Sequence, residues 1–254
     1  MIPECAPDDI HDFRITVKKL KAIIRLFNAV STRASACRFP KSLNKVYKTL
    51  GFMRECQIQK QKILKAANEM GGMEPLIYLK KINRKTELFK QKVIRSIQSL
   101  PDVNKKKDQI INDCSEEITG TSITQYIQTK MDAIQLLLRN RQCDDEHMHE
   151  MRKKIKDIQY IFSGVAKNDH IPVSSSQLRT IQRVSAELGE FHDLCVAIVL
   201  LKKELKLRDK ELDEQKILRK TKDNWLTEKN ELHQHIIESI QSLIRKNVHE
   251  FSMN

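Results

Sequence analysis

The sequence predicts an all-α protein, and two observations lead to that fold class. The 254 residues include only 6 Gly and 6 Pro, which leaves few positions for tight turns. Leu, Ile, Lys, Glu and Gln are abundant, and these residues favour helices. We therefore expect long helices rather than a strand-rich fold, and a chain of this length can bury a sizeable core.

The first helix is predicted over residues 8–27, with one apolar and one cationic face. At about 100° per residue, an apolar set falls within an arc of about 80°: Phe13, Val17, Leu20, Ile24 and Phe27. A cationic set falls within a second arc of similar width: His11, Arg14, Lys18, Lys21 and Arg25. Asp8 and Asp9 stand at the start, where we expect them to cap free backbone N–H groups.

Glycine and proline predict where the next helices begin and end. A second helix is expected between "RFP", residues 38–40, and the break "MGGM", residues 70–73. A third begins near Glu74 and Pro75 and ends before Pro101. A shorter helix is expected after the turn "TGTS" at residues 119–122.

The second half is predicted to repeat this scheme. A helix covers "DEHMHEMRKKIKDIQYIF", residues 145–162, and a loop follows at residues 168–176. The next helix runs through "LGEFHDLCVAIVLLKK", residues 188–203, and a long charged helix ends the chain. The Glu- and Lys-rich stretch at residues 202–222 is typical of a solvated helical face.

Two motifs recur at one spacing, which predicts an internal duplication. An offset of 138 residues places His11 on His149, Arg14 on Arg152 and Lys18 on Lys156. The same offset places "LGFMRE", residues 50–55, on "LGEFHD", residues 188–193, and Lys41 and Lys45 on Arg179 and Arg183. The pentapeptide "SIQSL" also recurs, at residues 96–100 and 239–243. We expect one repeat in residues 1–120 and a second in residues 121–254.

The net charge of +13 is concentrated in the first half. Residues 1–138 hold 25 Lys and Arg against 14 Asp and Glu, whereas residues 139–254 hold 21 against 19. Such an excess indicates a polyanionic partner, and a solvated Lys-rich surface is the alternative.

The chain carries no sign of export or of a membrane. Its six cysteines show no C-x-x-C pair, which is typical of ordinary thiols in a reducing compartment. The N-terminus lacks the pattern of a signal peptide, and no run of about 18 apolar residues occurs. We expect a cytoplasmic protein.

The doubled His-x-x-Arg-x-x-x-Lys helix, with a Leu-Gly-x-x-basic-acid segment some 40 residues later in each copy, resembles the CHAD domain, the "conserved histidine α-helical domain". The resemblance covers nearly all of residues 1–254. It implies two four-helix bundles related by pseudo-twofold symmetry, with basic residues lining a central groove. It also implies binding of inorganic polyphosphate without catalysis, and recruitment to polyphosphate granules or to a polyphosphate enzyme.

The resemblance and the charge pattern together give eighteen candidate polyphosphate ligands. Those of the first half are His11, Arg14, Lys18, Lys21, Arg25, Lys41, Lys45, Lys48, Arg54, Lys81 and Arg84. Those of the second half are His149, Arg152, Lys153, Lys156, Arg179, Arg183 and His192. A chain with about one negative charge per phosphate needs repeated cations and little else. At the second-copy positions that match Lys19, Lys21 and Arg25 stand Asp157, Gln159 and Ser163, so we expect the first copy to hold most of the ligand.

Other functions are weighed against this interpretation. Nucleic-acid backbone binding is the main alternative, although 5% aromatic residues and a single Trp225 offer few stacking platforms for single strands. A metal site is suggested by Asp8 with His11 and by Glu146 with His149, but lysines and arginines surround these histidines. No phosphate-binding loop and no G-x-S-x-G motif is present. We therefore expect a binding protein that is not an enzyme and that uses no cofactor and no metal.

Overall fold

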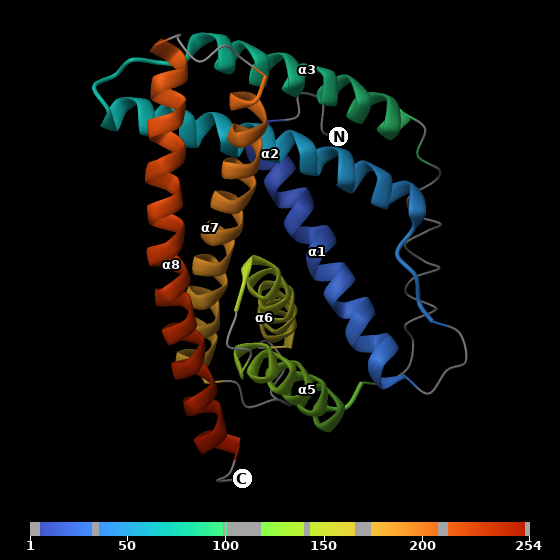
Figure 1. The fold of residues 1–254 in the computed structure, drawn as a ribbon. Helices are drawn as coiled ribbons and strands as arrows, with labels where there is room; N and C mark the ends of the chain where they lie inside the picture. Colours follow the sequence, from blue (N-terminus) through green and yellow to red (C-terminus); the bar gives the residue numbers. More distant parts are fainter. Residues whose placement is uncertain are drawn as a thin grey trace. The chain divides into compact units, whose positions relative to one another are not determined.

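The computed structural model describes residues 6–31, 36–98, 100, 118–139, 143–165, 174–207 and 213–251, and all secondary structure in these ranges is helical (Figure 1). The helices are α1 (Pro7–Val30), α2 (Lys41–Glu69), α3 (Leu76–Gln98), α5 (Gly120–Arg139), α6 (Asp145–Val165), α7 (Ser175–Leu205) and α8 (Asp213–Phe251). The all-α prediction is confirmed.

The chain divides into two compact units. The first unit comprises Met1–Val17, Pro40–Val103 and Asp193–Glu231, and the second comprises Lys18–Phe39, Asn104–His192 and Leu232–Asn254. Helices α1, α7 and α8 each contribute a part to both units. The units therefore differ from the repeats at residues 1–120 and 121–254, and the duplication, the paired four-helix bundles and their symmetry stay predictions.

Local signals end α2 and begin α7. Helix α2 ends at Glu69, before Gly71 and Gly72, whose φ angles of 101° and 84° lie in the left-handed region that glycine adopts without strain. The Gly72 N–H then donates to the Ala67 carbonyl at 2.8 Å, which closes the helix end. Before α7, Ser174 and Gln177 exchange backbone and side-chain hydrogen bonds in a capping box. The predicted loop before α7 lies mostly outside the described residues.

Two predicted helix starts are wrong in detail. Helix α1 begins at Pro7, so Asp8 and Asp9 lie in its first turn instead of capping it from outside. Proline suits this position because the first helical N–H has no partner within the helix. Helix α5 begins at Gly120, and Thr119 caps it by accepting a hydrogen bond from the Ser122 N–H at 3.2 Å. The segment "TGTS" is therefore the first turn of a helix.

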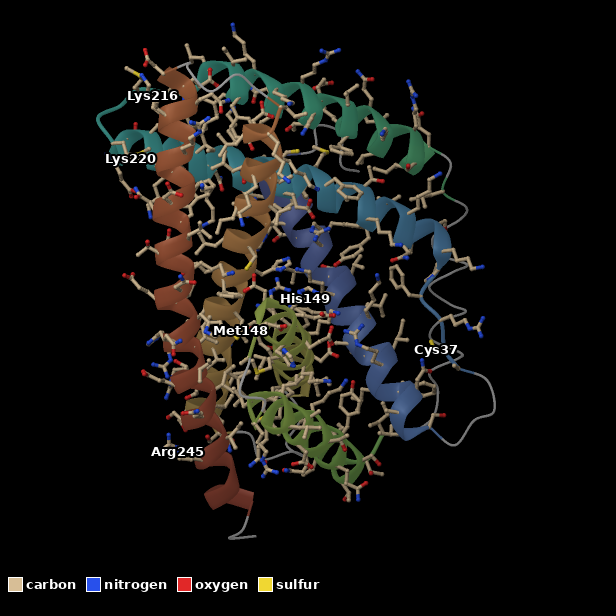
Figure 2. All side chains as sticks on the ribbon, viewed as in Figure 1. Cys37, Met148, His149, Lys216, Lys220 and Arg245 are labelled. Atoms are coloured by element: carbon tan, nitrogen blue, oxygen red, sulfur yellow. The ribbon has the colours of Figure 1, made fainter. Side chains whose placement is uncertain are left out.

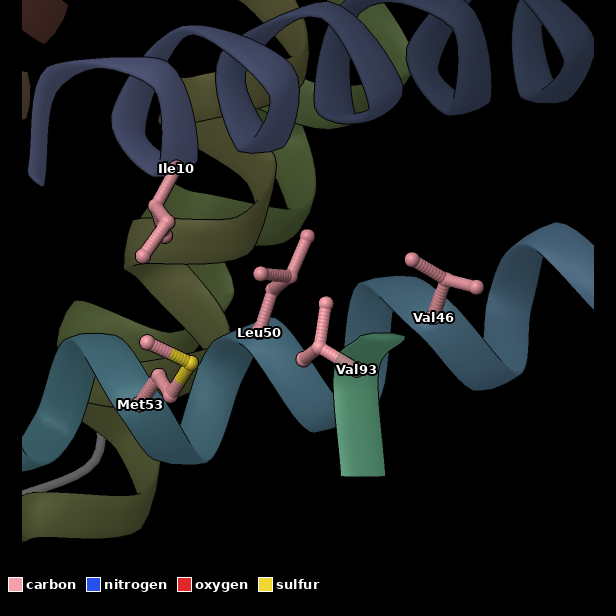
Figure 3. Packing of buried hydrophobic residues seen from close by; sticks show 5 residues of the cluster. All are labelled: Ile10, Val46, Leu50, Met53 and Val93. Atoms are coloured by element: carbon pink, nitrogen blue, oxygen red, sulfur yellow. The ribbon is translucent and has the colours of Figure 1, made fainter. Parts of the chain in front are cut away.

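The core of the first unit joins α1, α2 and α3. Ile10, Val46, Leu50, Met53 and Val93 form one buried cluster (Figure 3). The partly buried residues that pack against it are Phe13, Phe89, Ile97 and Leu100. Helices α2 and α3 lie against each other as an antiparallel pair joined by residues 70–75 (Figure 1).

Polar contacts connect α2, α3, α7 and α8 within the first unit. The buried Gln59 amide donates to the Tyr78 hydroxyl at 3.0 Å and to the Ala197 carbonyl at 3.4 Å. The Glu214 carboxylate accepts the Tyr78 backbone N–H at 2.8 Å, so α8 supplies the cap of α3. Lys81 donates to the buried Glu204 carboxylate at 2.6 Å.

The second unit buries the apolar face of α6 and the end of α1. Met151, Ile155 and Ile158 have no exposed surface, as their spacing predicts. Ile24 and Phe27 form a further buried cluster with Cys37. Helices α5 and α6 pack against each other in this unit (Figure 1).

The expectations of free thiols and of no membrane span can be compared with the structure for the described residues. Cys37, Cys56, Cys143 and Cys195 are not joined in disulfides, while Cys5 and Cys114 lie outside the described residues. In those same ranges, no helix is both long and apolar enough to cross a membrane.

Leu50→Ala is expected to lower the free energy of unfolding by about 2–5 kcal/mol, because Leu50 is fully buried and the cavity adds to the lost transfer free energy. Leu88→Ala is the matched control, since this leucine is 52% exposed on α3 and its loss should cost less than about 0.5 kcal/mol. Denaturant unfolding monitored by circular dichroism measures both changes. Equal losses would contradict the position of the core.

Candidate functional site

Four predicted ligands form an electrostatically coupled group in the second unit. Lys18 comes from α1, His149 and Arg152 from α6, and His192 from α7. The rings of His149 and His192 lie with their centroids 5.1 Å apart and their planes at 31°. We call these four residues the histidine cluster.

The buried face of α6 determines where the histidine cluster lies on that helix. Met148 and Met151 are buried, so the half-buried His149 and Arg152, each one residue further on, stand at the edge of the apolar stripe. Figure 2 labels the first of these pairs, Met148 and His149, on α6. The two are three residues apart and therefore project from the same side of the helix.

Burial and positive charge keep both histidines neutral. Burial lowers the pKa of His192 to about 4, and the nearby Arg152, His149 and Lys18 contribute in the same direction. Burial also lowers the pKa of His149, with Lys153 and Arg152 as further causes and Glu150 and Glu146 opposing them. At pH 7 each imidazole is uncharged and keeps one N–H donor. Burial is the largest cause of both shifts, and the cations Arg152 and Lys18 near His192 add a positive local charge that favours an anion.

Two lysines beside the cluster on α6 differ in their partners. Lys156 donates to the Gln159 side-chain oxygen at 3.2 Å, and Ser185 donates to the same oxygen at 2.6 Å. The neutral Gln159 side chain thus helps to orient Lys156 on α6. Lys153 instead donates to the Glu150 carboxylate at 2.6 Å on the surface.

Arg25 is held by a carboxylate. Its Nε donates to Asp157 at 2.9 Å, and its second contacting nitrogen reaches the other oxygen of the same carboxylate. Lys130 lies 3.7 Å from this buried carboxylate. Burial together with Asp157 raises the pKa of the neighbouring Tyr126 to about 12, so its hydroxyl stays neutral. A phosphate at Arg25 would therefore have to compete with Asp157.

In the first unit, Arg14 is held by residues of α2. Its guanidinium carbon lies 4.7 Å from the centroid of the Tyr47 ring, and Nη1 donates to the Tyr47 carbonyl at 3.0 Å. A Cβ added to Gly51 would lie 2.7 Å from that Nη1. Glycine in the first Leu-Gly segment thus makes room for the guanidinium. At Gly189, the matching glycine, an added Cβ would meet no described heavy atom within 4 Å.

Glu55 and Asp193, the acids of the two Leu-Gly segments, interact electrostatically in the first unit. Burial raises the pKa of the Glu55 carboxyl, Arg14 lowers it, and Asp193 raises it. Arg54, the basic residue of the first segment, donates to the Gln57 side-chain oxygen at 3.4 Å. The two segments are 138 residues apart in sequence, so only the fold brings their acids together.

The remaining predicted ligands have other surroundings. Lys81 is bound to Glu204, and Lys21 lies 4.9 Å from the centroid of the Phe39 ring. The Nε of Arg183 lies 3.9 Å from the Glu187 carboxylate. The exposed positions are His11, Lys41, Lys45, Lys48, Arg84 and Arg179. The eighteen residues are divided between the two units, and a single central groove lined by all of them stays a prediction.

Sequence reasoning missed the side chains that hold the cations. Tyr47 has a readable signal, because it lies four residues before Gly51 and thus on the same face of α2. Gln159 and Asp157 were assigned only as lost cations, and no local pattern reveals their partners. Within the described ranges, no group of three or more His, Cys, Asp or Glu residues is arranged to hold a metal ion.

Comparisons with known proteins bear on this site. A family model described as the CHAD domain matches residues 3–202. The crystal structure of the CHAD domain from the plant Ricinus communis is similar to this chain, with a TM-score of 0.71 and 16% identity over 96% of this chain and 83% of that chain. At this identity the likeness shows the fold alone. No curated protein sequence matches the chain.

Gly51→Ala is expected to act on Arg14, which a double-mutant cycle with Arg14→Met measures. In the Arg14→Met background, alanine should raise the free energy of unfolding by up to about 1 kcal/mol, since it favours the helix more than glycine does. With Arg14 present the gain should be smaller by about 1 kcal/mol, because the methyl group displaces Nη1 from the Tyr47 carbonyl. Equal effects in both backgrounds, in denaturant unfolding, would contradict the close approach.

Proposed function

The chain belongs to the CHAD domain family, and on that premise we propose that it binds inorganic polyphosphate without reacting with it. The family is the one that the paired motifs predict. The histidine cluster carries the proposal: Lys18, Arg152 and two histidines gather in one unit. Burial lowers the pKa of His192, and repulsion from Arg152, His149 and Lys18 adds to that shift. A bound anion would relieve that repulsion.

The chemistry of the cluster suits a phosphate chain. The guanidinium of Arg152 offers paired N–H donors that match two phosphate oxygens, and Lys18 adds a point charge. The neutral histidines each donate one hydrogen bond. Lys156, which donates to Gln159, is a further basic residue on the same helix. Cations in series with few aromatic groups fit a ligand that carries charge and no bases.

Binding without catalysis is part of the proposal. Phosphoryl transfer generally uses Mg²⁺ held between carboxylates and phosphate. In the second unit the buried carboxylate of Asp157 is engaged by Arg25 and Lys130. Recruitment to polyphosphate granules or to a polyphosphate enzyme, in the cytoplasm, rests on family analogy. Nucleic-acid backbone binding is the alternative that the first experiment must separate.

Lys18→Met/Arg152→Met is expected to weaken binding of long-chain polyphosphate at least tenfold, because two charge-assisted contacts of about 1.5–3 kcal/mol each would be lost. The measurement is a titration at about 150 mM salt, where loose attraction is screened. Arg139→Met/Arg245→Met is the matched control, since it removes the same charge from exposed positions of the same unit that are not candidate ligands. Its effect should stay below about threefold.

The same titration separates the rival interpretations. Equal losses in the two variants would reduce the cluster to general surface charge. Displacement of polyphosphate by duplex DNA or RNA would favour backbone binding. The predicted dominance of the first copy is tested by Arg14→Met/Lys18→Met against Arg152→Met/Lys156→Met, and the first pair should lose more affinity.

Polyphosphate binding is expected to strengthen as the pH falls from 8 to 5.5. The pKa of His149 and that of His192 both lie below the usual value in the free protein, and a bound polyanion raises them by favouring imidazolium. Binding therefore takes up protons, and the gain approaches tenfold per pH unit for each proton bound. Titrations at both pH values measure it. An unchanged pH dependence in His149→Gln/His192→Gln would show that other groups are responsible.

A further inference from the structure

An exposed aromatic stack lies on the α2–α3 pair of the first unit and includes no residue of the histidine cluster. The rings of Phe52 and Phe89 lie with their centroids 5.3 Å apart and their planes at 19°. Phe52 is 50% exposed even though it stacks on Phe89. The proposed polyphosphate function makes no use of these rings, because a phosphate chain has no ring to stack on them.

The core of the first unit holds one ring of the stack in place. Phe89 is partly buried and packs against the core cluster of Ile10, Val46, Leu50, Met53 and Val93. Phe52 therefore rests on a ring whose position is determined by the core, and its orientation is defined although half of it faces solvent. A preformed flat surface loses little conformational entropy when a second flat group stacks on it.

Lysines accompany the stack on both helices. The Lys92 ammonium lies 5.4 Å from the centroid of the Phe89 ring. On α2, Lys41, Lys45 and Lys48 precede Phe52 by eleven, seven and four residues, a spacing that places all four on one face of the helix. The three lysines are exposed, and no described carboxylate forms an ion pair with them. From Lys41 to Phe52 the surface extends over about 16 Å of helix, at 1.5 Å per residue.

We propose that this surface, formed by Phe52, Phe89, Lys92 and the three α2 lysines, binds a single-stranded nucleic acid. A base stacks on the Phe52 ring while the neighbouring phosphates contact the lysines, which is how cationic surfaces with aromatic platforms hold single strands. A duplex keeps its bases stacked inside and offers no free face to Phe52. A second copy of this chain would bring the same lysines face to face and would be repelled.

Phe52→Leu tests the stacking contact, because leucine keeps an apolar side chain and removes the aromatic face. Fluorescence anisotropy would measure binding of a labelled 12-residue oligo(A) RNA, its oligo(dA) counterpart, and an abasic sugar-phosphate strand of equal length. We expect Phe52→Leu to weaken both base-bearing strands about tenfold, the size of one lost stack. The abasic strand and long-chain polyphosphate should bind Phe52→Leu as they bind the parent chain.

Two further variants make the result decisive. Leu88→Ala, which removes an equally exposed apolar group from α3, should leave binding of oligo(A) within about twofold. Lys45→Met/Lys48→Met should weaken the base-bearing and abasic strands alike, since phosphates are common to both. The proposal is overturned if the parent chain binds the abasic strand as tightly as oligo(A), or if Phe52→Leu binds oligo(A) normally. A dimer dispersed by Phe52→Leu in analytical ultracentrifugation would overturn it as well.

Failure here and failure of the proposed function are distinguishable. The polyphosphate titration depends on Lys18 and Arg152, whereas the strand titration depends on Phe52. Suppose that Lys18→Met/Arg152→Met loses polyphosphate binding and that Phe52→Leu binds oligo(A) as tightly as the parent chain. That result would support polyphosphate binding and overturn single-strand binding. The RNA and DNA strands in the same assay tell which sugar is preferred.

Discussion

The burial of the apolar stripe on α6 is the constraint on which the candidate site depends. Met151, Ile155 and Ile158 have no exposed surface, so the helix has one orientation in its unit and its basic residues have one direction. Hydrophobic burial of this size outweighs the repulsion between the cations that it brings together. The pKa values of the two histidines are lowered by burial first and by the neighbouring charges second. An anion is the group that would offset the repulsion.

The cations of this chain fall into three physical classes, which net charge alone does not separate. Arg25 and Lys81 are bound by buried carboxylates, and their charges stabilise the fold. Arg14 lies against an aromatic ring and a backbone carbonyl, where Gly51 leaves space for it. Lys18 and Arg152 lie beside histidines and other positive charges. A surplus of +13 thus includes cations whose surroundings differ in kind.

Two surfaces with different chemistry follow from these classes. The histidine cluster combines cations with hydrogen-bond donors and suits phosphate oxygens. The α2–α3 surface combines cations with a half-exposed phenylalanine stack and suits bases joined by phosphates. The low overall content of aromatic residues argues against single-strand binding. Two phenylalanines in one exposed stack change that argument, because stacking depends on where rings gather and less on how many there are.

The sequence by itself determined the helical class, the bounds of α2 and α3 to within a few residues, the buried stripes of α1 and α6, and the family. These features are encoded locally, in periodicity, in glycine and proline, and in motifs that repeat at one offset. Only the tertiary structure decided which carboxylate meets which cation. Asp157 looks in the alignment of the two copies like a lost cation, yet it is the partner of Arg25, 132 residues away. Glu214 caps α3 from a distance of 136 residues. Such pairings depend on how buried faces pack, and a periodic pattern contains the faces without containing their partners.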